Sequence, residues 1–179
     1  MKKIIFLFII IFSITGCKTI QINTSYGYKV TTKKENEVYN KIDIGTTIMD
    51  TSKKEKSPLT RVSISSKDEK NNIKETPKTI KIISNKKEYI INIDSKYNTI
   101  YPVYDNGIII DSDNFILEIG NIKFKNGTIL NIPPLLIKRY VYVYKINNFL
   151  DALNQNTRED LFEGTIEEYR EWKKRNMNK

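Results

Sequence analysis

Residues 79–92, TIKIISNKKEYIIN, decide the fold class of this chain. Two runs rich in β-branched and aromatic residues lie on either side of Asn85-Lys86. Residues of these types favour β-strands, and a two-residue polar step between two such runs is a hairpin signal. We therefore expect two antiparallel strands joined by a tight turn at Asn85-Lys86.

The same pattern of strand-like runs and turn residues continues towards the C-terminus. Asn126-Gly127 separates NIKFK from TILNI, and Asp105-Asn106-Gly107 separates TIYPVY from IIID. Asn and Gly accept the positive φ that tight hairpin turns need. We expect a hairpin at each of these two positions.

Strand patterns also occur outside this central region. Val62 and Ile64 alternate with polar residues, and YVYVYKI at residues 140–146 follows the interruption at Pro133-Pro134. Strands joined by hairpin turns favour antiparallel sheets. The expected fold class is α+β, with a mainly antiparallel β-sheet body over residues 37–146, either a curled sheet or a small sandwich, followed by short C-terminal helices.

The C-terminal segment changes to a helical period. Asn148 can cap a short helix, and Thr157 can cap another turn that ends near Gly164. Thr165 and Glu168 have the spacing of a capping box, which predicts a final helix over 166–176. Its apolar residues lie within about 120° of arc at 100° per residue; they are Ile166, Tyr169 and Trp172. We expect Trp172 to be the main anchor of this helix.

The first 16 residues have the pattern of an export signal. Lys2-Lys3 precede an unbroken apolar run from Ile4 to Phe12, and small residues follow up to Gly16. This order is typical of a signal peptide. The run is shorter than the roughly 20 apolar residues needed to span a bilayer. We predict that residues 1–16 are removed from the mature protein.

Ile14-Thr15-Gly16-Cys17 resembles the lipobox of bacterial lipoproteins, and the resemblance covers only these first 17 residues. It implies cleavage between Gly16 and Cys17. It also implies a diacylglyceryl group on the Cys17 sulfur and a fatty acyl group such as palmitate on the new amine. In lipoproteins of cells with an outer membrane, Asp after the cysteine favours retention in the inner membrane. Lys18 occupies this position here, so we expect the protein in the outer membrane of such a cell, and otherwise on the outer face of the cytoplasmic membrane. The alternative is a buried Cys17 beside an ordinary signal peptide.

The domain organisation follows from these patterns. Residues 1–16 are the expected lipoprotein signal peptide, and the polar residues 17–36 are expected to form a lipidated tether. Residues 37–179 are expected to form a single β-rich domain, whose helices lie within 147–179. Two or three acyl chains at about 0.8 kcal/mol per buried CH₂ would hold the protein on a bilayer.

The composition restricts the chemistry of the chain. There is no histidine and only one cysteine, so Ser-His and Cys-His nucleophile systems and His/Cys zinc sites are not expected. We expect no cofactor, no transition metal and no metal-ligating residues, and we identify no catalytic residue.

The alternative function is a carboxylate-dependent enzyme that acts on the cell wall as glycoside hydrolases do. Its scattered candidates are Asp111, Asp113, Glu118, Glu159, Asp160 and Glu163.

The segment Asp111-Ser112-Asp113-Asn114 begins like a calcium-binding loop. The pattern then fails, because Phe115 takes the place of an oxygen ligand and Ile116 the place of the loop glycine. We therefore interpret this segment as a polar turn.

Three alternating tyrosines form the candidate binding surface. Tyr140, Tyr142 and Tyr144 share one face of a predicted strand, with Val141 and Val143 on the other. Such a stripe can stack on sugars or grip a peptide, and the alternative is a half-buried sheet face with wet hydroxyls.

The expected partners follow from export and charge. The net charge is +9, and an exported, membrane-tethered chain rarely meets nucleic acid. We expect the lipid bilayer, through acylated Cys17, as the main partner, with an envelope protein or an anionic wall or lipid polymer as further partners. The sequence predicts a non-catalytic envelope lipoprotein, structural or binding, and does not define its oligomeric state.

Overall fold

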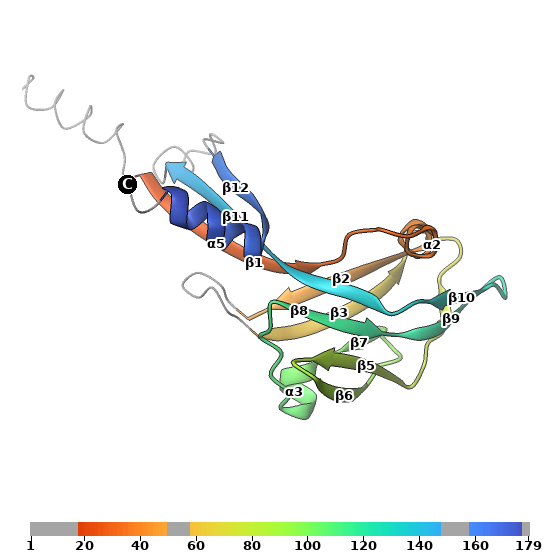
Figure 1. The fold of residues 1–179 in the computed structure, drawn as a ribbon. Helices are drawn as coiled ribbons and strands as arrows, with labels where there is room; N and C mark the ends of the chain where they lie inside the picture. Colours follow the sequence, from red (N-terminus) through yellow and green to blue (C-terminus); the bar gives the residue numbers. More distant parts are fainter. Residues whose placement is uncertain (1–17, 50–57, 148–157, 177–179) are drawn as a thin grey trace, which may run out of the picture. The chain divides into compact units, whose positions relative to one another are not determined.

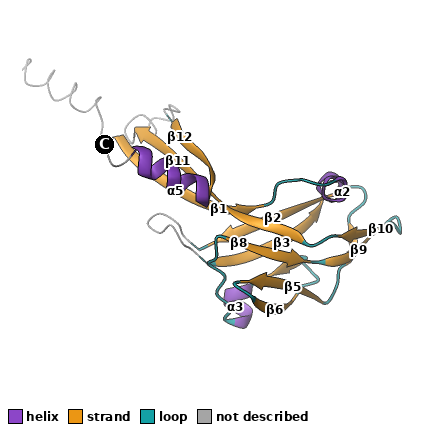
Figure 2. Ribbon diagram, in the orientation of Figure 1, coloured by secondary structure: helices purple, strands orange, loops and turns teal. Residues whose placement is uncertain are grey.

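A computed structural model describes residues 18–49, 58–147 and 158–176 (Figure 1). Most of these residues lie in antiparallel strands, with three short helices (Figure 2), and this confirms the α+β class. The strands are β1 Lys18–Gly27, β2 Ile42–Ile48, β3 Leu59–Ser66, β4 Ile73–Glu75, β5 Thr79–Ser84, β6 Lys87–Asn92, β7 Thr99–Ile100, β8 Asn114–Glu118, β9 Gly120–Phe124, β10 Ile129–Ile132, β11 Leu135–Asn147 and β12 Glu159–Thr165. The helices are α2 Lys33–Lys41, α3 Pro102–Asn106 and α5 Ile166–Asn176.

The described strands form three sheets. The largest has the order β1-β11-β8-β5-β6, and β12 also pairs with β11. The two smaller sheets have the orders β10-β9-β4 and β2-β3-β7. β10 is therefore an edge strand, hydrogen-bonded to β9 alone among the described strands.

The chain divides into two compact units, each with its own apolar core. The larger unit is Thr24–Tyr140, and the smaller unit combines the residues before Thr24 with those after Tyr140. β1 and β11 thus contribute residues to both units. The core of the smaller unit is Val141, Val143, Ile166 and Tyr169. The sequence suggested one domain from residue 37, whereas the contacts divide the chain after Asn23 and after Tyr140.

Two of the three predicted hairpins are confirmed. Ser84 pairs with Lys87 across Asn85 and Lys86, whose φ values are 50° and 63°. The second hairpin joins β9 to β10 through Gly127, at φ 88°. Positive φ at these turn positions is the conformation that tight hairpins require.

The third predicted hairpin, at Asp105-Asn106-Gly107, is wrong. These residues end the short helix α3, and Gly107 at φ 63° caps it by donating its N–H to the Pro102 and Val103 carbonyls. The local sequence fits both structures. Proline in the first turn and glycine just after the last residue are also the signature of a short helix.

The segment predicted as a tether has regular structure. Residues 18–27 form β1, and Tyr26 is only 5% exposed. Thr32 and Glu35 form a capping box that begins α2 at Lys33. The polar composition of this segment favours a tether, whereas the spacing of Thr32 and Glu35 is the signal that starts a helix.

The C-terminal expectations had mixed outcomes. Helix α5 is confirmed, and Glu168 accepts hydrogen bonds from the Thr165 N–H and hydroxyl at 2.7 Å and 3.1 Å. The predicted helical turn before Gly164 is instead strand β12, and the short helix expected after Asn148 lies outside the described residues. The buried anchors of α5 are Ile166 and Tyr169, whereas Trp172 is half-buried. The structure therefore favours Ile166 and Tyr169 over Trp172 as the main anchors of this helix.

Candidate functional site

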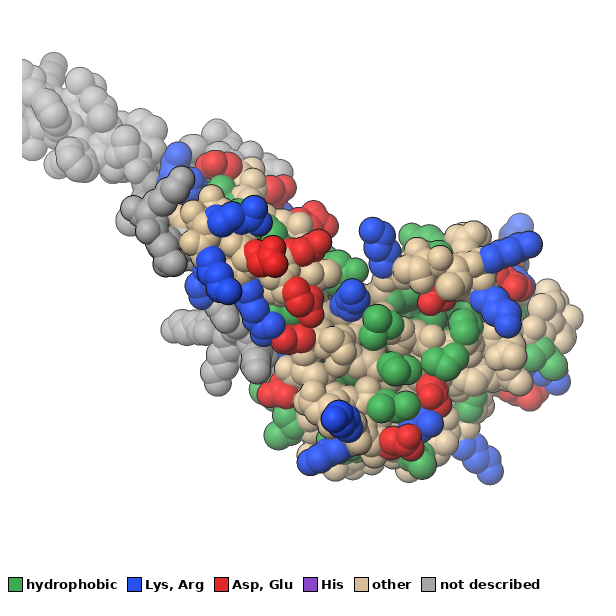
Figure 3. Space-filling model, viewed as in Figure 1, with side chains coloured by type: hydrophobic (Ala, Val, Ile, Leu, Met, Phe, Trp, Pro, Cys, Tyr) green, Lys and Arg blue, Asp and Glu red, His purple; other side chains and the backbone are tan. Residues whose placement is uncertain are grey.

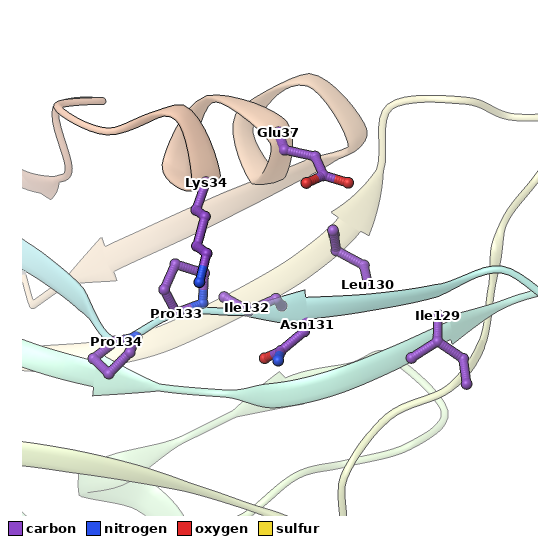
Figure 4. Close-up of a pocket in the computed structure, with 8 residues that line it drawn as sticks. All are labelled: Lys34, Glu37, Ile129, Leu130, Asn131, Ile132, Pro133 and Pro134. Atoms are coloured by element: carbon purple, nitrogen blue, oxygen red, sulfur yellow. The ribbon is translucent and has the colours of Figure 1, made fainter.

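A groove of about 490 Å³ lies between helix α2 and the edge strand β10 of the larger unit (Figure 4). Lys34 and Glu37 line it from α2, and the six consecutive residues Ile129–Pro134 line it from β10 and the chain that follows. Figure 1 shows β10 between α2 and β9. The outer side of β10 therefore faces the groove.

Helix α2 is held in place by its cap and by one buried side chain. The Glu35 carboxylate accepts hydrogen bonds from the Thr31 and Thr32 N–H groups at 2.7 Å and 2.9 Å. These hydrogen bonds lower the pKa of Glu35. Val38 is fully buried in the core. The exposed Lys34 and Glu37 of the same helix are thereby fixed at the groove.

Glu37 also forms an ion pair within α2. Its carboxylate lies 2.8 Å from the Lys41 ammonium, four residues on. The hydrogen bond and charge of Lys41 lower the pKa of Glu37. Because both side chains are exposed, this pair contributes little to stability, and Glu37 can exchange it for another contact.

Side chains of β10 alternate between the core and solvent. Leu130 and Ile132 are 2% and 4% exposed and belong to the core, whereas Ile129 is 62% exposed and Asn131 is also exposed. The buried pair fixes the strand in the sheet. Ile129 and Asn131 remain accessible to a binding partner.

The backbone of β10 leaves hydrogen-bonding groups on its outer side. Phe124 donates its N–H to the Thr128 carbonyl at 2.9 Å, and Leu130 lies opposite Ile122 in the same ladder. Hydrogen-bonded and non-bonded pairs alternate along antiparallel strands. The N–H and C=O groups of Ile129 and Asn131 are therefore directed away from β9.

This arrangement is that of a sheet edge that can accept one short strand. An extended peptide can bind such an edge through main-chain hydrogen bonds. β10 has only four residues and is followed by Pro133-Pro134. Short edges and prolines limit uncontrolled pairing between sheets, so the edge can take a short segment without continuing into a long ladder.

The predicted tyrosine surface is divided between the two units. Tyr140 belongs to the larger unit, and Tyr142 and Tyr144 belong to the smaller one. All three are half-buried, whereas Val141 and Val143 are buried. The alternation of β11 therefore follows the sequence pattern.

Tyr144 already has partners inside the smaller unit. Its hydroxyl donates to the Gln21 side-chain oxygen at 2.8 Å and accepts from the Asn23 amide at 3.0 Å. The Arg158 guanidinium lies 4.3 Å from its ring centroid. These contacts favour a structural role for Tyr144, and the groove becomes the better candidate for a binding site.

A buried polar cluster surrounds Arg139, which sequence analysis did not single out. Arg139 is fully buried. Its guanidinium donates to the Tyr26 hydroxyl at 2.5 Å and to the Asp111 carbonyl at 2.8 Å. The Tyr26 hydroxyl donates in turn to the Ser112 carbonyl at 2.6 Å. The cluster ties β1 and β11 to the chain before β8.

Burial has a strong effect on Tyr26. It raises the pKa of the Tyr26 phenol to about 12, against the opposing effect of the Arg139 charge. The Ser112 and Ser84 hydroxyls lie 2.7 Å apart beside it. The residues that begin like a calcium loop thus take part in a structural cluster, in agreement with their interpretation as a polar turn.

None of the six scattered candidate carboxylates lines the groove beside β10 or the second groove given below. Glu118 lies 2.9 Å from Lys81, and Glu159 lies 3.7 Å from Lys145. A second, polar groove of about 440 Å³ has Asp68 as its one acidic lining residue. Within residues 18–49, 58–147 and 158–176, no group of three or more Cys, Asp or Glu residues could hold a metal ion.

None of the helices in the described part of the chain is long and apolar enough to cross a membrane. No protein-family model, no curated protein and no solved structure matches this sequence.

Proposed function

We propose that this protein is a non-catalytic, lipid-anchored lipoprotein of the bacterial cell envelope that binds an extended segment of a partner protein beside β10. The anchor rests on the lipobox-like residues Ile14–Cys17. The binding function rests on one observation, the outer edge of β10 facing a groove. The proposed location of the protein is the outer membrane in a cell that has one, and otherwise the outer face of the cytoplasmic membrane.

The chemistry of the groove defines the bound segment. Ile129 and Asn131 offer main-chain donors and acceptors, which bind an extended backbone irrespective of its sequence. The remaining lining of β10 is mainly aliphatic or proline, and Lys34 and Glu37 carry opposite charges. The groove therefore suits a short extended segment with apolar side chains and no strong net charge.

A wall-active enzyme is the alternative function. A carboxylate mechanism needs two carboxyl groups roughly 5–10 Å apart across the scissile bond. Each groove described above has one acidic lining residue, Glu37 in one and Asp68 in the other. One carboxylate in each groove is fewer than the two that this mechanism needs, which supports a binding function over glycoside hydrolysis.

The anchor is tested by fatty-acid labelling. Cells that express the full chain and are grown with a clickable palmitate analogue should label the protein. Cys17→Ala should abolish the label, because the thioether requires the Cys17 thiol. Detection uses in-gel fluorescence after normalising for protein amount. Label that persists in Cys17→Ala would contradict lipidation at this residue.

The groove is tested by crosslinking in cells. A photo-crosslinking amino acid at Ile129 should give a discrete adduct, and Asn131→Pro should reduce its yield about tenfold or more. Proline removes the outward N–H of Asn131, worth about 1 kcal/mol, and places its ring in the path of an added strand. Asn131→Ala keeps that N–H and should retain most of the adduct. Adduct yield is measured by immunoblot.

Ile109 provides the matched control position. It is 63% exposed, nearly the same as Ile129 at 62%, and does not line the groove. A probe at Ile109 should not give the Ile129 adduct. An adduct that forms equally from both positions, or that survives Asn131→Pro in a variant with an unchanged circular dichroism spectrum, would rule out strand addition at β10.

A further inference from the structure

The last turn of α5 concentrates positive charge in the smaller unit. Lys173, Lys174 and Arg175 lie at its C-terminal end, whereas Glu167 and Glu168 lie in its first turn. The helix therefore has an acidic end and a basic end. Where the basic end lies within this unit follows from the directions of the strands around it.

Strand β1 begins at the end of this unit where β11 finishes. Tyr144 contacts Gln21 and Asn23 through its hydroxyl, and β1 and β11 are neighbours in the sheet. Both strands continue into the larger unit, β1 after Asn23 and β11 before Val141. Lys18, the first residue of β1, therefore lies at the end of this unit where β11 finishes.

Helix α5 runs towards the same end. β12 starts there, because Glu159 pairs with Lys145 at 3.7 Å. α5 follows β12 directly, and its first residue, Ile166, packs with Val141 and Val143. One turn before its end, Trp172 packs in the same cluster as Ile22. Figure 1 shows the last turn of α5 beside the start of β1.

This basic end is formed by Lys18, Lys173, Lys174 and Arg175. Lys18, Lys174 and Arg175 are exposed, and Lys173 is half-buried. The neighbouring Glu159 and Asp160 have basic partners in Lys145 and Arg158. Figure 3 shows both blue and red side chains on the face of this unit in view. Even with the exposed Glu171 counted, the basic side chains outnumber the acidic ones among the described residues at this end.

We propose that this basic end binds the anionic headgroups of the membrane that carries the Cys17 anchor. The inference rests on the proposed lipid anchor, because Cys17 immediately precedes Lys18 and so brings the basic end to the bilayer surface. Each Lys or Arg close to an anionic surface strengthens binding about fivefold. The acyl chains would hold the protein, and the basic end would orient the smaller unit against the headgroups.

The test uses the unlipidated mature chain, residues 17–179, which keeps every described helix and strand. With Cys17 blocked by iodoacetamide, it should sediment with vesicles of phosphatidylglycerol and phosphatidylcholine, and much less with phosphatidylcholine alone. The triple variant Lys173→Gln, Lys174→Gln and Arg175→Gln should bind at least about tenfold more weakly. High salt should weaken wild-type binding, because headgroup attraction is screened.

A matched variant changes the same charge elsewhere. Lys29, Lys70 and Lys125 are exposed residues of the larger unit, and replacing all three by Gln should leave vesicle binding within about twofold. Equal loss in both triple variants would mean that net charge alone drives binding, and would overturn the proposal. So would wild-type binding that is the same with neutral vesicles.

Two further outcomes separate this proposal from others. Retention on immobilised poly(glycerol phosphate) without vesicle binding would assign the basic end to a wall polymer and overturn the membrane assignment. Because the chain in this test has no lipid, its result is independent of the labelling of Cys17. A Cys17 that is not lipidated would refute the anchor while leaving the vesicle measurement intact.

Discussion

Arg139→Ala should lower the free energy of unfolding of the larger unit by about 3–5 kcal/mol. Arg139 is fully buried, and its guanidinium donates to the Tyr26 hydroxyl and the Asp111 carbonyl. The substitution removes the donor from the buried Tyr26 hydroxyl, and a buried acceptor left without its donor costs about 1–3 kcal/mol. It also leaves a cavity where the long side chain lay.

Two further variants identify the origin of this loss. Lys138→Ala, at the neighbouring half-buried position of β11, should change stability by less than about 0.5 kcal/mol. Arg139→Lys keeps a charge but not the planar fork that reaches two acceptors, and should recover only part of the loss. Urea denaturation followed by far-ultraviolet circular dichroism gives all three values. A loss below about 1 kcal/mol for Arg139→Ala would show that the cluster is not a major source of stability.

The burial of Arg139 could have been predicted from the sequence. Val141 and Val143 occupy the inward positions of β11, and the strand period of two places Arg139 on the same face. The alternation of Tyr and Val marks this strand only from Tyr140 onwards, and a charged residue is rarely expected at a buried position.

Local turn chemistry explains which hairpins were predicted correctly. Asn85, Lys86 and Gly127 adopt positive φ in tight turns, and Asn and Gly accept this conformation more readily than most residues. Gly107 also has positive φ, but it caps a helix. A glycine indicates that positive φ is possible at its position, but it does not indicate whether that position belongs to a hairpin turn or to the end of a helix.

Strand β12 and the groove depend on contacts between segments that are far apart in the sequence. β12 has the sequence EDLFEGT and forms a strand by pairing with β11. Strand propensity is largely a property of such packing contexts. Similarly, the β9–β10 hairpin was predictable, but the outer position of β10 follows from the sheet order β10-β9-β4. No local pattern in Ile129–Ile132 indicates which side of the strand stays open.

Tyr169→Ala should destabilise the smaller unit more than Trp172→Ala does. Tyr169 is fully buried among Val141, Val143 and Ile166, and truncating a buried aromatic side chain costs about 3–5 kcal/mol. Trp172 is half-buried, with its ring centroid 6.0 Å from that of Tyr169. Its truncation removes less buried area and should cost about 1–2 kcal/mol. An eleven-residue helix is marginal alone, so α5 depends on this packing.

The single tryptophan makes this difference measurable in the smaller unit alone. Trp172 is the only Trp in the chain and belongs to that unit, so its fluorescence during urea denaturation reports how the unit unfolds. Tyr169→Ala should shift this transition to markedly lower urea, whereas Tyr97→Ala, at a position 59% exposed, should leave it unchanged. Far-ultraviolet circular dichroism provides the comparison with Trp172→Ala, which lacks the fluorophore. A larger loss for Trp172→Ala than for Tyr169→Ala would make Trp172 the main anchor of α5, because the helix would then owe more of its stability to the half-buried indole than to the buried phenol.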